Sequence, residues 1–95
     1  MKINYNNKMV TYSELDGLED ISIGNTYLYK NPLNGEIILI LLRTMQRGQL
    51  VFDDVEYLVN PTNDKKLRNV CYPFEKFLSK TTKSEFYRVD SIIEN

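Results

Sequence analysis

The stretch TYLYKNPLNGEIILILLRT, residues 26–44, carries the strongest structural signal in the chain. At its centre, residues 31–35 contain an Asn-Gly pair, which adopts positive φ at little cost, and a proline, which cannot extend a strand ladder. On the N-terminal side of this turn, residues 26–30 are rich in β-forming types. The stretch therefore predicts a β-hairpin.

The second arm of this hairpin, residues 36–44, contains an unbroken apolar run at residues 37–42. A run that does not alternate predicts a strand with both faces covered, although a run of this length also fits a short helix. The β-branched side chains and the flanking turns favour the strand.

Short strands at close spacing continue toward the C-terminus. A tight turn at residues 46–48 precedes a strand at residues 49–52. The acidic pair Asp53-Asp54 is expected to end that strand, and residues 55–59 form the next one.

The C-terminal third predicts a strand, a helical turn and a final strand. Residues 67–72 form the first strand. The step Tyr72-Pro73 then opens a helix, because the missing N–H of proline costs nothing in a first turn. Residues 85–89 form the last strand, and residues 91–95 add one more turn.

The N-terminal part predicts two short strands, at residues 2–5 and 9–12. A short helical turn follows, with Ser13 as its cap and Gly17 near its end. This turn connects the N-terminal strands to the hairpin.

These elements together indicate a mainly β protein, of the β-rich α+β class. Short strands joined by tight turns are typical of a small, strongly bent antiparallel barrel, here of the SH3-like type with one or two short helical turns. The length fits a single domain, residues 1–95. We expect residues 23–90 to be the barrel core and residues 1–22 an N-terminal extension.

The composition limits the available chemistry. The chain has no histidine and one cysteine, Cys71, which excludes histidine catalysis and a Cys/His zinc site with several ligands. With no histidine to act as its base, Cys71 is interpreted as a small buried hydrophobe and not as a reactive thiol. We expect no enzymatic activity, no metal and no cofactor.

The densest acidic group is Asp53, Asp54 and Glu56. It has two interpretations: a Mg²⁺ site or an edge that meets a basic partner, and a solvated turn that blunts a sheet edge. The turn is favoured, because no other carboxylate pattern completes a site.

No feature of the sequence indicates export or a membrane. The first residues lack the apolar region of a signal peptide, and the longest apolar run is far shorter than the ~20 residues of a membrane helix. The abundance of Asn, Lys, Ile and Tyr and the absence of Ala and Trp are typical of an AT-rich bacterial or phage genome. We expect a location in the bacterial cytoplasm, or in the host cytoplasm if a phage encodes the protein.

Basic side chains gather in the C-terminal third, although the net charge of the whole chain is −1. One interpretation is a phosphate-binding groove with stacking tyrosines, and the other is a solvated loop beside the polar face of a helix. The candidate residues for a nucleotide or nucleic-acid site are Lys65, Lys66, Arg68, Tyr72, Lys76, Lys80, Tyr87 and Arg88.

The seven tyrosines are the most unusual surplus of the composition. Tyr27 and Tyr29 share one face of a predicted strand, and Tyr5 and Tyr12 lie near the N-terminus. Exposed tyrosines favour protein interfaces, whereas half-buried tyrosines are ordinary in strands. Both interpretations remain open at the level of the sequence.

Three short patterns carry a family resemblance. They are the Gly-x-x-Tyr start of residues 24–29, the Pro-x-x-x-Phe spacing of residues 73–77, and the Phe-Tyr-Arg of residues 86–88. With these patterns, residues 23–90 resemble small uncharacterised bacterial and phage proteins with an SH3-like barrel. A Tyr-Pro step stands where that pattern has Arg-Pro. The resemblance implies the barrel and no particular activity.

Two hypotheses for the function follow. The first is a non-catalytic protein-binding module, such as a phage or mobile-element protein that inhibits or adapts a host protein. The second is a nucleotide or nucleic-acid binder that uses the basic residues 65–88, for example a sponge for a signalling nucleotide. Self-association is compatible with either, because it enlarges the core of a small domain.

Overall fold

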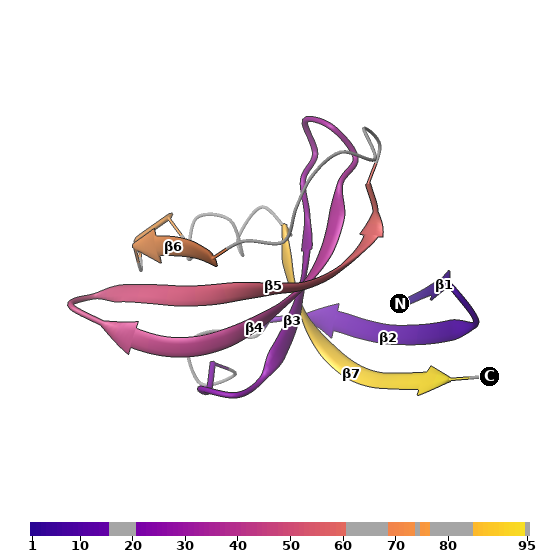
Figure 1. Cartoon of the computed structure of the whole chain (residues 1–95), viewed down its shortest axis with the longest axis horizontal. Coiled ribbons are helices and arrows are strands. Elements are labelled where there is room, and N and C mark those ends of the chain that lie inside the picture. Colours follow the sequence, from indigo (N-terminus) through magenta and orange to yellow (C-terminus); the bar gives the residue numbers. More distant parts are fainter. Residues whose placement is uncertain (16–20, 61–68, 74, 77–84, 95) are drawn as a thin grey trace.

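A computed structural model describes residues 1–15, 21–60, 69–73, 75–76 and 85–94 of the chain. Seven strands of these residues form one antiparallel sheet in the order β1-β2-β7-β3-β4-β5-β6 (Figure 1). The mainly β fold predicted from the sequence is confirmed. The strands are β1 (Lys2–Tyr5), β2 (Lys8–Glu14), β3 (Thr26–Lys30), β4 (Ile37–Gln46), β5 (Gln49–Val59), β6 (Asn69–Pro73) and β7 (Phe86–Glu94).

The sheet has β1 and β6 at its two ends, and no pairing between these ends occurs among the described residues. β3, β4, β5 and β6 follow one another as a meander, and β7 lies between β2 and β3. Glu75 and Lys76 are the helical residues in the described ranges. No helical segment in those ranges has the length and apolarity to span a bilayer.

The two predicted turns of the central meander are confirmed. In the β3–β4 connection, the Asn31 N–H donates to the Glu36 carbonyl at 2.8 Å, and the Gly35 N–H donates to the Asn31 carbonyl at 2.9 Å. The β4–β5 turn places Arg47 at φ 49° and Gly48 at φ 73°. Positive φ at both central positions is the geometry that matches the twist of a two-residue hairpin.

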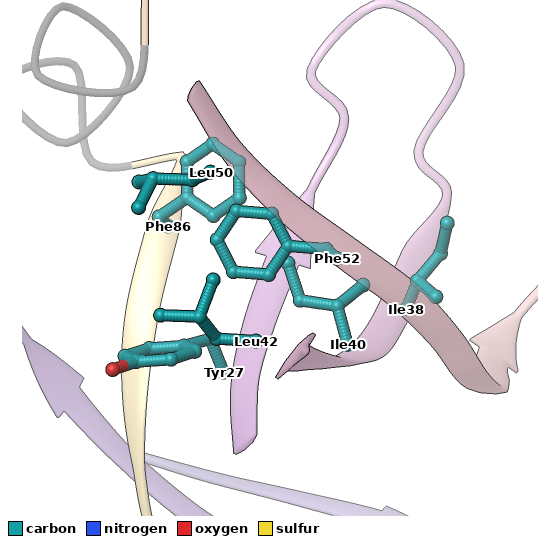
Figure 2. Close-up of a cluster of buried hydrophobic side chains, with 7 residues drawn as sticks. All are labelled: Tyr27, Ile38, Ile40, Leu42, Leu50, Phe52 and Phe86. Carbon is teal, nitrogen blue, oxygen red and sulfur yellow. The ribbon is translucent and has the colours of Figure 1, made fainter. Parts of the chain in front are cut away.

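The core consists of two apolar clusters on the two faces of the sheet. β4 supplies both, because Ile38, Ile40 and Leu42 belong to the first cluster and Leu39 belongs to the second. This alternation confirms that the apolar run is a strand covered on both faces. The first cluster is Tyr27, Ile38, Ile40, Leu42, Leu50, Phe52 and Phe86 (Figure 2), and the second is Val10, Tyr12, Leu28, Leu39, Leu58 and Tyr87.

The predicted break at Asp53 and Asp54 is wrong. β5 continues through both residues, and Asp54 is 9% exposed and lies opposite Ile40 of β4. The β4–β5 register shifts at three places. Such bulges bend a long strand around its core, so the acidic pair lies within β5 and is not a solvated turn.

The start of one predicted helical turn and most of another are strand. Ser13 lies in β2 and not at a helix cap, and residues 16–20 of that predicted turn lie outside the described residues. The turn predicted at residues 91–95 is wrong up to Glu94, because β2 offers β7 a pairing partner as far as Lys8, opposite Glu94. The β1–β2 hairpin therefore belongs to the same sheet as the meander.

The helix predicted to open at Tyr72-Pro73 begins later. Pro73 is the last residue of β6 and lies opposite Gln49 of β5. An edge strand tolerates proline because one of its sides needs no N–H donor. The strand predicted before it is confirmed at Asn69–Pro73, while residues 74 and 77–84 lie outside the described part of the chain.

Candidate functional site

The tyrosines of β3 are core residues. Tyr27 is fully buried, its hydroxyl accepts a hydrogen bond from the Ser22 N–H at 3.0 Å, and its ring meets Phe52 edge-on. Tyr29 is half-buried and stacks on Phe86 with 4.9 Å between ring centroids. Tyr27 is therefore not part of an exposed tyrosine surface, and most of Tyr29 is committed to the first cluster.

Tyr87 is also committed to packing. It is 8% exposed and meets Tyr12 edge-on at 5.1 Å. The Lys30 ammonium lies 4.6 Å from the Tyr12 ring centroid and 5.1 Å from that of Tyr87, and it donates to the Tyr12 hydroxyl at 2.6 Å. The cluster joins β2, β3 and β7, which the sequence alone does not bring together. A base cannot stack on the covered Tyr87 ring.

The remaining members of the predicted phosphate site are only partly described. Lys76 is exposed, and the half-buried Arg88 donates to Asp90 at 3.0 Å and to the Ser13 hydroxyl at 3.0 Å. The backbone of Tyr72 lies in β6, but its side chain is not among those described. The residues outside the described ranges are Lys65, Lys66, Arg68 and Lys80.

Two members of the acidic group of β5, Asp53 and Glu56, form ion pairs. Asp53 contacts Arg43 at 3.4 Å, and Glu56 contacts Lys8 at 3.4 Å. No group of three metal-ligating side chains occurs among the described residues. Asp53 therefore connects β5 to the neighbouring β4, whereas Glu56 connects β5 to β2, a strand that does not pair with it.

The interpretation of Cys71 as a buried hydrophobe is wrong, because Cys71 is exposed. It lies opposite Val51 in the end strand β6, where no further described strand follows. A position at the end of the sheet leaves this small side chain open to solvent.

β3 and β7 diverge beyond a short paired stretch (Figure 1), and a hollow lies where they separate. The two strands pair only from Tyr27, opposite Arg88, to Tyr29. The residues before β3 pair with β4 instead: the Gly24 N–H donates to the Leu42 carbonyl at 2.8 Å. β7 meanwhile continues along β2 to Glu94. The resulting hollow of about 440 Å³, the β7 groove, is lined by Gly24, Asn25, Thr26, Tyr27, Arg88, Val89 and Ile92.

The backbone of β7 presents hydrogen-bonding groups to this groove. Met1 and Tyr12 exchange hydrogen bonds, each donated to the other's carbonyl at 2.9 Å, so the peptide groups of Tyr12 face β1. Peptide groups point to alternate sides along a strand, so in β2 those of Met9, three residues before Tyr12, face β7. Met9 is paired with Ile93, and the peptide groups of Ile93 therefore face β2. The peptide groups of Ile92, one residue before, therefore point away from β2 and toward the groove.

One exposed apolar side chain lines this groove: Ile92, which is 43% exposed. Ile93, the next residue of β7, is 48% exposed on the opposite face of the sheet, because successive side chains of a strand alternate. Ile23, which precedes the lining residue Gly24 on the opposite wall, is 56% exposed. Sequence reasoning missed this site, although the adjacent isoleucines at residues 92–93 were a signal that a polar terminal turn does not explain.

A second hollow, of about 500 Å³, lies beside the β3–β4 connection. It is lined by Lys30, Glu36 and Glu85 together with Asn31, Pro32, Gly35 and Ile37. Leu33, next to it in the chain, is 94% exposed. This hollow lies beside a loop, whereas the β7 groove, which polar and apolar groups line together, lies beside a strand edge.

In comparisons with known proteins, no family model, no curated protein and no solved structure matches this chain.

Proposed function

We propose that this protein is a small non-catalytic binding module that acts by direct contact with a protein partner. The observation that carries the proposal is the β7 groove, where a strand edge, a hollow and the exposed side chain of Ile92 coincide, with the exposed Ile23 next to the lining residue Gly24. Single exposed apolar residues are common, but such side chains around one groove are typical of interaction sites.

The strand connectivity supports an SH3-like barrel as the scaffold of this module. The strands β7-β3-β4-β5-β6 form a meander in which the last strand returns to pair with the first. That connectivity is the one of an SH3-like barrel, and the helical residues Glu75 and Lys76 precede the returning strand. In this proposal the β1–β2 hairpin is an addition that extends the sheet at β7.

The second hypothesis, nucleotide or nucleic-acid binding, receives less support. It needs basic groups that converge on accessible aromatic rings. The Tyr87 ring is covered by Tyr12 and Lys30, and the Arg88 guanidinium is engaged with Asp90. An inhibitor or adaptor that works through protein contact needs neither arrangement.

Site-specific photo-cross-linking tests the proposed function. We would place a photoreactive phenylalanine at Ile92 and, as a matched control, at the exposed Leu33, which lies at the other end of β3. We expect a partner captured from cell lysate through Ile92 and not through Leu33. The captured protein, once purified, is expected to bind the wild-type chain and to bind Ile92→Asp at least tenfold more weakly. Equal capture at both positions, or equal affinity, would refute a partner site at the groove.

A further inference from the structure

Resting on the proposed function, we propose that the β7 groove takes an extended peptide segment of the partner, which adds as a strand to the edge of β7 that faces away from β2. In this mode, main-chain hydrogen bonds supply much of the affinity, and alternate side chains supply specificity. The groove is then a place where the partner continues the sheet of this protein.

The backbone geometry makes this assignment. From Phe86 to Arg88, this edge of β7 is covered by its pairing with Tyr29 to Tyr27 of β3. The described pairing with β3 ends at Arg88. Beyond Arg88, the peptide groups of Ile92 and Glu94 point to the same side as the groove, because those of Ile93 face β2. Backbone donors and acceptors at a strand edge that faces a hollow are matched best by another extended backbone.

The dimensions fit a short segment. From Val89 to Glu94 the strand extends about 17 Å, at about 3.4 Å per residue. A bound segment of five or six residues covers this length. Its alternate side chains on one face lie near Ile92, and across the hollow they meet the wall formed by Gly24 and Asn25.

The charges of β7 argue against a second copy of this chain as the occupant. If two β7 edges paired antiparallel about Ile92, Asp90 of each copy would lie opposite Glu94 of the other. Like charges directly opposite each other destabilise a strand pair. Asp90 and Glu94 are both exposed, and each also contacts a cation of its own chain, Arg88 at 3.0 Å and Lys8 at 3.8 Å. A foreign segment without acidic residues opposite them avoids the like-charge contact that a second copy would make.

The test begins with peptides selected from a phage-displayed random heptapeptide library against the intact protein. Binding is measured by calorimetry, and the contact site is mapped from amide shifts in NMR spectra. Each selected peptide is then made in versions with a single N-methylated amide, one for every position. N-methylation removes one backbone donor and leaves the side chains in place.

A strand that adds to β7 uses every second N–H of the peptide. We therefore expect N-methylation to weaken binding at least tenfold at alternate positions and less than threefold at the positions between them. The amide shifts are expected at Val89, Ile92 and Glu94. Ile92→Thr, which keeps a β-branched side chain, is expected to weaken binding, whereas the control Leu33→Ser is not.

Three other results overturn the proposal in distinguishable ways. Peptides that bind in the groove with no alternation in the N-methyl profile would refute strand addition and leave the proposed function standing. Failure to select any peptide that shifts groove amides would refute the groove as a peptide site, and photo-cross-linking then decides the proposed function separately. A dimer in sedimentation that dissociates on Ile92→Thr would make the occupant a second copy.

Discussion

Shortening Phe52 tests the packing of the first cluster. Its ring is fully buried and meets Tyr27 edge-on and Phe86 in a stacked arrangement, each with 6.0 Å between centroids (Figure 2). Removing a buried phenylalanine side chain costs about 3–5 kcal/mol. Each aromatic pair contributes about 0.5–1.5 kcal/mol beyond its buried area.

These values predict a graded response. Phe52→Leu retains much of the volume and loses both ring contacts, so we expect a loss of about 1–3 kcal/mol in the free energy of unfolding. Phe52→Ala is expected to lose about 3–5 kcal/mol. A domain of this size has a total stability of roughly 5–14 kcal/mol, so Phe52→Ala approaches the limit of folding.

Urea unfolding followed by far-UV circular dichroism measures both losses. The matched control is Val55→Thr in the same strand, where the side chain is 46% exposed. We expect that control to change stability by less than about 0.5 kcal/mol. A loss for Phe52→Ala no larger than the loss for Val55→Thr would refute the assignment of Phe52 to the core.

Three further predictions concern other parts of the molecule. Tyr12→Phe removes the hydroxyl that accepts a hydrogen bond from Lys30 at 2.6 Å. We expect the free energy of unfolding in urea to fall by about 0.5–1.5 kcal/mol, and an unchanged midpoint would contradict this. In Gly48→Ala the added Cβ has no atom within 4 Å, but the residue keeps φ at +73°. We therefore expect conformational strain alone to lower the free energy of unfolding by about 1–2 kcal/mol, and a raised urea midpoint would contradict this. Cys71 is exposed and is expected to react with a thiol reagent in the native protein; reaction only after unfolding would show that it is buried.

Local patterns predicted the central meander well. In each of three segments, a few adjacent residues were enough to predict the structure. These segments are the Asn-Gly turn before β4, the apolar run of β4 and the turn at Arg47-Gly48. In these segments the structure is determined by turn residues and by the hydrophobic pattern of residues close together in the sequence.

Errors occurred where distant pairings decide the outcome. Asp53 and Asp54 carry a local signal for a break, but pairing with β4 on one side and β6 on the other keeps Asp53 in the strand. The helical turn predicted after Val89 was overridden by β2, which lies at the opposite end of the sequence. Tertiary context outweighs local propensity at such positions.

The candidate site could not be predicted for the same reason. The β7 groove exists because Gly24 pairs with β4 while β7 follows β2. Neither of these two pairings can be predicted from the residues around Ile92. Composition alone drew attention to tyrosines, whose rings at Tyr27 and Tyr87 stabilise the interior.

The position of β7 between β2 and β3 has a consequence for biosynthesis. β2 ends at Glu14, and its partner begins roughly 70 residues later, at Phe86. At about 5–20 residues per second, the ribosome needs about 4–14 s to make the chain between them. An isolated two-stranded hairpin is at best marginally stable in water. The N-terminal hairpin therefore cannot complete its place in the sheet until β7 has been made and inserts between β2 and β3, two segments that precede it in the chain.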